Sequence, residues 1–467
     1  MRSLSSTLLA AQKLRTKKDL IRLVLSNNGT SYTHYSVTGS NRIKERELIE
    51  EDDRQSGYVV LDNFDNTVSD RDLKGFKAVL SGGMTASGDE YSAHPPLYIV
   101  SQNKGSSQGS KDVILTLAGI FNLMNEDEAS ESYTQEDDDS NTVKTLLRRV
   151  AGDTGETILT AYTHCKSYDI VFDSEDDLID TFIPADVFSI PFKANRLSKL
   201  KELLNYTDCV MRVENDGKIH VRIPTVSTTT QWVADTAYSV NDTVVPTVAN
   251  EVEYICTIAG TSDSSEPTWA NALEVGDTIV DGPVTWTVGY DYEYRAPSPT
   301  HPSYHTFFSE EFRKRVVIPG YIEVESNPAH TTIYSGNASD ADYSGYPDHM
   351  QKRGHYRVRA TSNAQCTNIA TALLSHAQAA AERGWGVVPI NVGAEVHDFV
   401  KVKDARLNDY RVGNIGYIRW YYKAGTQPTM EFRFGKLGVG IAGTPSVSST
   451  GGTFNINQIM SIINQIF

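Results

Sequence analysis

Short apolar runs, each with polar residues at alternate positions, recur between residues 20 and 125. The segment "LIRLVLSNNGTSYTHYSV" has two such runs on either side of Asn28-Gly29, a dipeptide that favours a tight hairpin turn. The pattern continues in "SGYVVLDNF", "FKAVLSGGM", "PLYIVSQN" and "DVILTLAGIF". Many short strands joined by turns are typical of a small barrel or sandwich, so we predict one of these two folds over residues 20–125.

Three segments instead repeat their apolar residues every three or four positions, which predicts amphipathic helices. In "NTVKTLLRRVAG" the pair Asn141-Thr142 is suited to cap the start of a helix and Gly152 to end it. "LSKLKELLNYTDC" begins at residue 197, and an alanine-rich segment covers residues 363–384.

Strand-like alternation returns between and after the predicted helices. "CVMRVENDGKIHVRIP" alternates on both sides of Asp216-Gly217 and predicts a β-hairpin. "FRKRVVIPGYIEVESN", "FVKVKDA", "NIGYIRWYYKA" and "TMEFRFG" predict further strands. The chain is therefore expected to have a β-rich α+β multidomain fold with helices interspersed among the strands.

Polar or biased segments mark the connections and ends of the chain. Residues 125–141, "NEDEASESYTQEDDDSN", are acidic and predict an exposed connection. Residues 437–452 form a Gly/Ser/Thr-rich linker, which leads to an apolar segment at 453–467. We expect that last segment to form a helix that docks on a neighbouring protein. The first 19 residues predict a short surface helix.

Chain length, net charge, apolar runs and cysteine spacing narrow the structural and functional classes to which the chain can belong. A chain of 467 residues is expected to form two to four domains. A formal net charge of −16 argues against a surface built to bind nucleic-acid phosphates, which needs clustered Lys and Arg. No apolar run approaches the ~20 residues of a membrane-spanning helix. The four cysteines have no CxxC spacing and are expected to be free, buried thiols.

No motif marks a catalytic centre. "GSSQG" at 105–109 has the spacing of a nucleophile elbow, but its polar flanks predict a hairpin loop. "DSEDDLID" at 173–180 lacks the glycine and the glutamate of a Ca²⁺ loop and predicts an acidic, solvated turn. His301 and His305 are four residues apart, but Pro302 opposes a helix that would aim both at one ion. We therefore expect no enzyme, no cofactor and no metal ligands.

The segment 229–290 concentrates aromatic residues, including three of the five tryptophans of the chain. Flat aromatic side chains can stack on sugar rings, and a domain of this size also needs large residues to build its core. We expect two of the tryptophans to be structural and one or two aromatics to be exposed. The candidate glycan-binding residues are Trp232, Tyr238, Tyr254, Trp269 and Trp286.

The pattern "W…AYSVNDTVV…EYICTIAGTSDSSEPTW…GDTIVDGPVTWTV" resembles small β modules related to chitin-binding carbohydrate modules. Such modules are often inserted in bacteriophage tail proteins. The resemblance implies a carbohydrate-module-like insert at 229–290 whose aromatics contact a sugar, although phage copies also occur as decoration.

The rest of the chain resembles the baseplate hub, or tail-tip hub, of tailed bacteriophages. The resemblance rests on the order of "YVVLDNFDNTVSDRDLKGFKAVLSGG", "PPLYIVSQN", "LKELLNYTDCVMRVENDGKIHVRIP", "KRVVIPGYIEVES", "VPINVGAEVHDFVKVKDARLNDYRVGNIGYIRWYY" and "MEFRFG". It implies a homotrimer in which each subunit carries two tail-tube-like β-barrels. The ring would adapt a six-fold tail tube to a three-fold tip, and DNA would pass through its channel without specific binding.

The resemblance also implies a division of the chain and a set of partners. The expected domains are an N-terminal segment at 1–19, a first barrel at 20–125, an acidic connection and α/β hub domain at 126–205, a discontinuous second barrel at 206–228 and 291–334, the insert at 229–290, a C-terminal α/β hub domain at 335–436, the linker at 437–452 and the terminal helix at 453–467. The expected partners in the virion are the tail tube or a distal tail protein, a neighbouring tail-tip or fibre protein, and a host-surface polysaccharide.

Two other functions stay open at this stage. The chain could be a carbohydrate-binding adhesin, or receptor-binding protein, in which the insert has the main role. It could also be a polysaccharide hydrolase with a binding module, which would need two carboxylates facing each other across a cleft.

Overall fold

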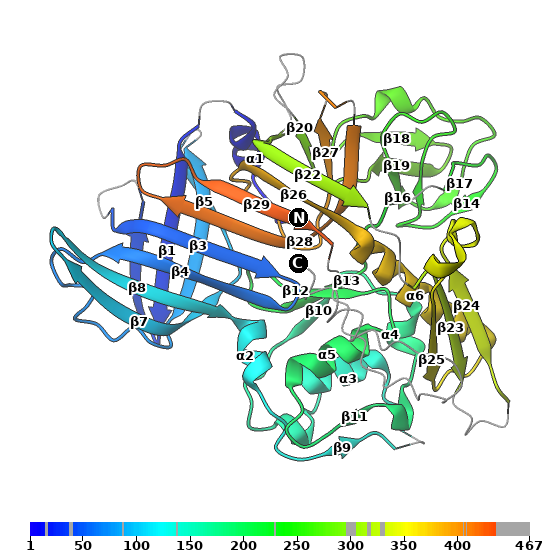
Figure 1. The fold of residues 1–467 in the computed structure, drawn as a ribbon, viewed down its shortest axis with the longest axis horizontal. Coiled ribbons are helices and arrows are strands. Elements are labelled where there is room, and N and C mark those ends of the chain that lie inside the picture. Colours follow the sequence, from blue (N-terminus) through cyan, green and yellow to red (C-terminus); the bar gives the residue numbers. More distant parts are fainter. Residues whose placement is uncertain are drawn as a thin grey trace.

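The computed structural model has a β-rich α+β fold, as the sequence predicts (Figure 1). The part of the chain that the structure describes comprises residues 1–14, 17–36, 41–85, 88–136, 139–227, 230–295, 305–314, 319–326, 332–404, 406–407 and 409–435. The predicted linker and terminal helix lie outside these residues.

Among the described residues, one sheet of 15 strands dominates and contains strands from both the N-terminal part and the later part of the chain. Its N-terminal strands are β1 (Asp19–Asn27), β2 (Thr30–Tyr35), β3 (Ile43–Glu51), β4 (Arg54–Asp62), β5 (Lys77–Thr85), β6 (Asp89–Ala93), β7 (Leu97–Ser107) and β8 (Ser110–Gly119). Its later strands are β20 (Tyr292–Arg295), β21 (His305–Thr306), β22 (Ser309–Lys314), β26 (Glu382–Pro389), β27 (Phe399–Asp404), β28 (Asp409–Lys423) and β29 (Thr429–Phe434).

The N-terminal strands form largely by local pairing. Hairpin β1–β2 turns at Asn28 and Gly29, both with positive φ, as the Asn-Gly pair predicts. The "GSSQG" segment joins β7 to β8 as a hairpin, which confirms that interpretation. Alternate residues of β1, β4 and β8 are buried, so each strand presents one apolar side to the interior.

Strand β28 connects the two sets of strands. Along one edge it pairs first with β27 and then with β3, where Tyr417 faces Glu51 and Lys423 faces Glu45. Its other edge pairs with β29. Side chains from both sets share one hydrophobic core, in which Trp420 of β28 is fully buried. The two sets are therefore one packed unit. Figure 1 draws the N-terminal strands in blue, β20–β22 in green and β26–β29 in orange.

The strand partners differ from the predicted second barrel at 206–228 and 291–334. The hairpin at Asp216-Gly217 exists, as β12 (Val210–Val213) and β13 (Ile219–Arg222), but it pairs with β10 (Ile170–Phe172) in a separate sheet. Strand β23 (Tyr321–Ser326) likewise forms its own sheet with β24 (Ser335–Ser339) and β25 (Arg353–Val358). Local alternation predicts a hairpin, whereas its outer partners depend on which apolar surfaces meet in the folded chain.

Helices cover these smaller sheets in a second body with its own core, at the lower right of Figure 1. The helical caps agree with the sequence: Thr142 caps α3, and Gly152 ends it in the left-handed conformation. The remaining elements of this body are α2 (Ile120–Glu126), β9 (Tyr133–Thr134), α3 (Val143–Ala151), α4 (Asp177–Thr181), β11 (Ser189–Ile190), α5 (Arg196–Leu204) and α6 (Asn363–Ala381), with short 3₁₀ turns at Thr160–Tyr162, Ala185–Val187, Tyr343–Gly345 and Asp348–Met350.

The N-terminal segment contains helix α1 (Ser6–Lys13), as predicted, but the helix is not a simple surface element. Leu8, Ala11 and Gln12 are buried, and α1 contacts β5 and β21. Its apolar side extends the core of the large sheet.

The connection between β26 and β27, residues 391–398, is buried along its whole length. Buried backbone groups need hydrogen-bond partners, and the N-terminal segment supplies several. Gln12 accepts a hydrogen bond from the N–H of Val392 at 2.8 Å, and Arg2 donates to the carbonyl of Val392 at 2.9 Å.

The second body supplies further partners for this connection through Arg212 of β12. Its guanidinium donates to the carbonyl of Val396 at 3.1 Å and pairs with Glu395 at 2.9 Å and Asp398 at 3.3 Å. Burial acts to raise the pKa of Asp398, but the amino terminus and Arg212 lower it by more, so the carboxylate stays charged. The connection thereby ties the large sheet to the second body.

Glu50 on β3 gives this buried region a testable pH dependence. Burial raises its pKa from 4.5 to about 7. The stability contributed by the neutral carboxyl is therefore complete below about pH 4.5 and is lost as the pH rises through about 7. Glu50→Gln should remove this loss and be more stable than the wild type at pH 8, by up to about 3 kcal/mol.

Urea unfolding between pH 4.5 and 8, followed by far-ultraviolet circular dichroism, measures the difference. The exposed Glu131→Gln serves as the control, and its stability should follow that of the wild type at each pH. Parallel curves for Glu50→Gln and the wild type would contradict the assignment.

Candidate functional site

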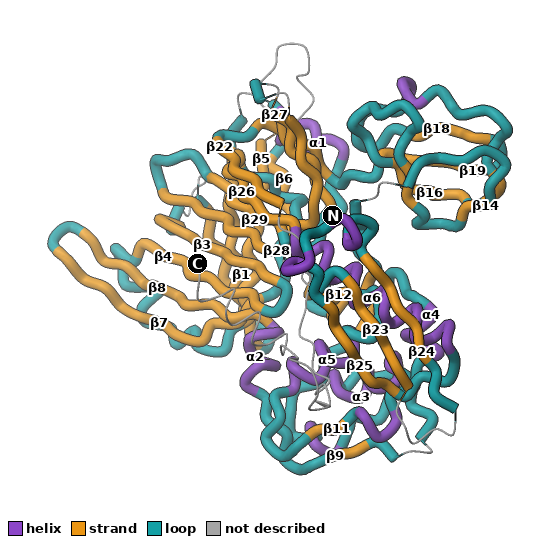
Figure 2. Tube along the Cα trace, turned by 45° about the vertical axis from the view of Figure 1, so that its right-hand side comes forward, coloured by secondary structure: helices purple, strands orange, loops and turns teal. Residues whose placement is uncertain are grey.

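The aromatic-rich segment folds as a separate lobe beside the large sheet (Figure 2). Its four-stranded sheet has the order β15-β16-β19-β18, and a short pair β14–β17 lies next to it. The elements are β14 (Ala237–Tyr238), β15 (Thr243–Val244), β16 (Tyr254–Ile258), β17 (Gly260–Thr261), a 3₁₀ turn at Trp269–Asn271, β18 (Thr278–Asp281) and β19 (Val284–Val288).

The aromatics of this lobe form its core. Trp286 and Tyr254 are 0% exposed, and Trp232 and Trp269 are each 6% exposed. Tyr238 is half-buried and packs edge-on against Trp286, with 4.9 Å between ring centroids.

A buried carboxylate anchors two of the indoles. Asp281, 2% exposed, accepts hydrogen bonds from Nε1 of Trp232 at 2.8 Å and from Nε1 of Trp286 at 3.0 Å. Its other oxygen accepts from the backbone N–H of Asp263 at 2.9 Å. The tryptophans are thus fixed at both their ring faces and their polar edges.

All three tryptophans are therefore structural, one more than the sequence led us to expect. A lobe this small has little volume for a core, and large rings fill it efficiently. The five candidate residues do not form an exposed aromatic strip, because only Tyr238 is partly exposed. Glycan binding by the insert stays a prediction.

The lobe is also packed against the large sheet. Phe399 on β27 belongs to its hydrophobic core, and the partly buried Val412 on β28 packs against that core. The ring centroids of Tyr290 and Phe399 lie 5.5 Å apart. Lys403 forms an ion pair with Glu251. The insert therefore has a fixed base on β27.

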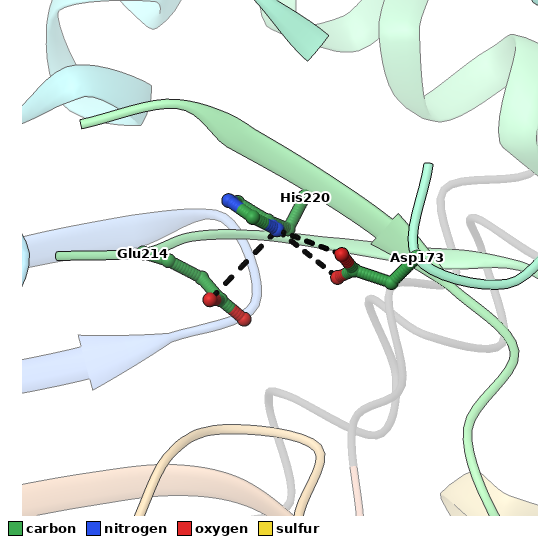
Figure 3. Close-up of side chains that lie close together, drawn as sticks. All are labelled: Asp173, Glu214 and His220. Carbon is green, nitrogen blue, oxygen red and sulfur yellow. Dashed lines mark hydrogen bonds and ion pairs between the residues drawn. The ribbon is translucent and has the colours of Figure 1, made fainter. Parts of the chain in front are cut away.

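A second cluster of chemically active side chains lies on the sheet β10-β13-β12 (Figure 3). Nδ1 of His220 lies 3.0 Å from Asp173 and 3.8 Å from Glu214. Nε2 of His220 lies 3.2 Å from Asp216. Burial lowers the pKa of His220, but the charge of Glu214 and the hydrogen bonds to Asp173 and Asp216 together raise it by more.

This cluster was not predicted from the sequence. Asp173 was assigned to a solvated acidic turn, and it is exposed, but it also faces a buried histidine 47 positions further along the chain. The rest of that turn starts a helix, with Asp176 capping α4. The only signals available in the sequence were a strand-borne histidine and nearby carboxylates, and neither shows that they meet.

The structure also shows how deeply the other residues singled out in the sequence are buried. His305 is buried, and His301 lies outside the described residues. All four cysteines are free; Cys165 is partly buried and the other three are buried. Among the described residues, no helix combines the length and apolar character needed to cross a membrane.

The role of Asp281 can be tested by Asp281→Ala. The change leaves two buried indole N–H groups without an acceptor, which should lower the stability of the lobe by about 2–6 kcal/mol. Tryptophan fluorescence should shift to longer wavelength, and limited proteolysis should cut within 230–289. Val280→Ala, at a neighbouring side chain that is 70% exposed, should change neither readout. Equal behaviour of the two variants would contradict a structural role for Asp281.

The chain was compared with known proteins. No family model matches it, and no curated protein does. A tail protein from Neisseria meningitidis is a similar solved structure, with 11% identity, a TM-score of 0.49, and 90% of this chain and 97% of that chain covered. A prophage MuSo2 tail protein from Shewanella oneidensis has 8% identity and a TM-score of 0.44, covering 88% and 98%. A prophage tail protein from Listeria monocytogenes has 9% identity and a TM-score of 0.43, covering 96% and 99%.

Proposed function

We propose that this protein is a structural tail-tip, or baseplate, hub of a tailed bacteriophage. The observation that carries the proposal is the single sheet in which β28 joins the N-terminal strands to the C-terminal strands. Two strand sets fixed in one unit are what a subunit needs in order to present two tube-like barrels to a ring. Of the six segments that resemble hub proteins, four contribute strands to these two sets, and the other two form β12–β13 and β23 in the second body.

The topology changes how the second barrel is proposed. It keeps β20–β22, which lie within the predicted range 291–334, and adds β26–β29, whereas the hairpin at 206–228 and strand β23 belong to other sheets. The first barrel remains at residues 20–125. Three subunits would form a ring of six barrels that fits a six-fold tail tube or distal tail protein on one side. A three-fold tail-tip or fibre protein would bind on the other side.

Electrostatics agree with a channel through which DNA passes without specific binding. The net charge of −16 repels phosphates, so a lumen with this character would not retain the DNA. The buried connection at 391–398 locks the large sheet to the second body, which suits a rigid structural part. The role proposed here is structural and needs no catalytic group.

The insert would be an accessory of the hub. We propose that it contacts a host-surface glycan or a neighbouring tail protein with surfaces other than its buried tryptophans. The adhesin alternative gives this lobe the main function and predicts that the remaining chain has no assembly of its own.

The oligomeric state tests the hub directly. Native mass spectrometry and electron microscopy of the full-length protein should show a homotrimer with three-fold symmetry, six lobes and a central hole. A compact monomer, both alone and mixed with the tail tube protein of the same phage, would contradict the proposal.

Removal of the insert separates the hub from the adhesin. In the test variant a short Gly/Ser linker replaces residues 231–288, and Tyr290 is kept because it packs on Phe399. Ring assembly should be unchanged, whereas any binding to host cells or glycans should be lost. The full-length Val280→Ala variant serves as a control that keeps the lobe folded. Loss of the ring in a variant that is otherwise folded would contradict an accessory role.

A further inference from the structure

Three adjacent strands bring potential metal ligands to one place. Asp173 directly follows β10, Glu214 directly follows β12, and His220 lies on β13 between them. His220 is opposite Val171 on β10 and Arg212 on β12, so the strand register fixes its position relative to both carboxylates. Figure 3 shows the three side chains converging.

His220 makes direct hydrogen bonds to Asp173 and Asp216, and its distance to Glu214 is one that a shared ion would bridge. Nδ1 of His220 lies 3.0 Å from an oxygen of Asp173, but 3.8 Å from Oε2 of Glu214, too far for a hydrogen bond. Two ligands that each lie about 2.1 Å from one ion are separated by about 3 to 4 Å. One ligand atom from each of the three residues lies within 4.8 Å of the others.

The surroundings hold the ligands in this arrangement. The other ring nitrogen of His220 faces Asp216 at 3.2 Å, the kind of outer carboxylate that orients metal-binding histidines. Oε1 of Glu214 accepts hydrogen bonds from Arg212 at 2.6 and 2.8 Å, which leaves Oε2 turned toward His220. Arg212 is itself fixed by the buried connection at 391–398.

We propose that Asp173, Glu214 and His220 bind a divalent transition-metal ion, with Zn²⁺ the preferred ion. Imidazole nitrogen with carboxylate oxygens suits Zn²⁺ and its neighbours rather than Ca²⁺ or Mg²⁺, which prefer oxygen ligands alone. Two carboxylate ligands neutralise the ion, and Asp173 is exposed, so the ion can enter from solvent. Water completes the coordination.

The ion would fasten the end of β10 to hairpin β12–β13. That hairpin also touches the large sheet, because a Cβ at Gly217 would lie 3.2 Å from Pro96, just before β7. The metal would thus stiffen the second body at its boundary with the barrels. This inference does not depend on the hub proposal, since it concerns ligands on one small sheet.

Zn²⁺ binding by the tag-free, full-length chain tests the inference. The protein is stripped with a chelator, dialysed and titrated with ZnCl₂ by calorimetry, with metal content measured by mass spectrometry. The wild type should bind one equivalent at this site and melt at a higher temperature with Zn²⁺ than with chelator. Co²⁺ should give a visible absorption spectrum that reports nitrogen and oxygen ligands.

Matched variants locate the ion. His220→Gln and Asp173→Asn should lose this equivalent and its thermal shift, and Asp216→Asn should weaken binding about 10–100-fold. His355→Gln is the control, because His355 also faces two carboxylates, Glu323 and Glu325, but in an exposed cluster on β23 and β25. The His355→Gln variant should still bind one equivalent of Zn²⁺ at the site formed by Asp173, Glu214 and His220.

If His220→Gln does not fold, Asp173→Asn provides the test, because Asp173 is exposed and asparagine has nearly the same size as aspartate. Two results would overturn the inference. One is a wild type that binds no Zn²⁺, which would leave a protonated His220 held by carboxylates. The other is undiminished binding in both His220→Gln and Asp173→Asn.

Discussion

The architecture depends on burying a polar connection. Residues 391–398 run through the interior between β26 and β27, where unpaired backbone groups would cost about 1–3 kcal/mol each. Side chains from the N-terminal segment and from β12 satisfy these groups, and His397 pairs with Asp52 at the β3–β4 turn at 2.8 Å. The hydrogen bonds that offset the cost of burying this connection also hold distant parts of the chain together.

The functional proposals follow from this rigidity. With β28 paired to both β3 and β29, the two strand sets cannot turn independently without breaking a ladder. The proposed hub role requires two strand sets at a fixed angle. A continuous sheet holds them so through its hydrogen-bonded ladders. Arg212 extends the same network to Glu214, and so to the proposed metal site.

The insert shows a different solution to the problem of stability. It has too few residues for an aliphatic core, so it uses three tryptophans and a buried aspartate that accepts from two of them. These tryptophans are buried in the core, so their ring faces are not exposed for stacking on a sugar. Phe399, which lies on β27, packs in the core of the lobe and so fixes the lobe to the large sheet.

The sequence by itself determined the local elements: the turn at Asn28-Gly29, the hairpin at Asp216-Gly217 and the cap and end of α3. Each depends on residues within a few positions of one another, so turn chemistry and periodicity suffice. Only the tertiary structure decided that hairpin β12–β13 pairs with β10 rather than with the large sheet, that the tryptophans point inward, and that Asp173 meets His220. Those outcomes depend on which apolar surfaces and charges from distant segments are buried together, as with Arg212 and Asp398, 186 positions apart. Alternation along one strand specifies a buried side but not its partner.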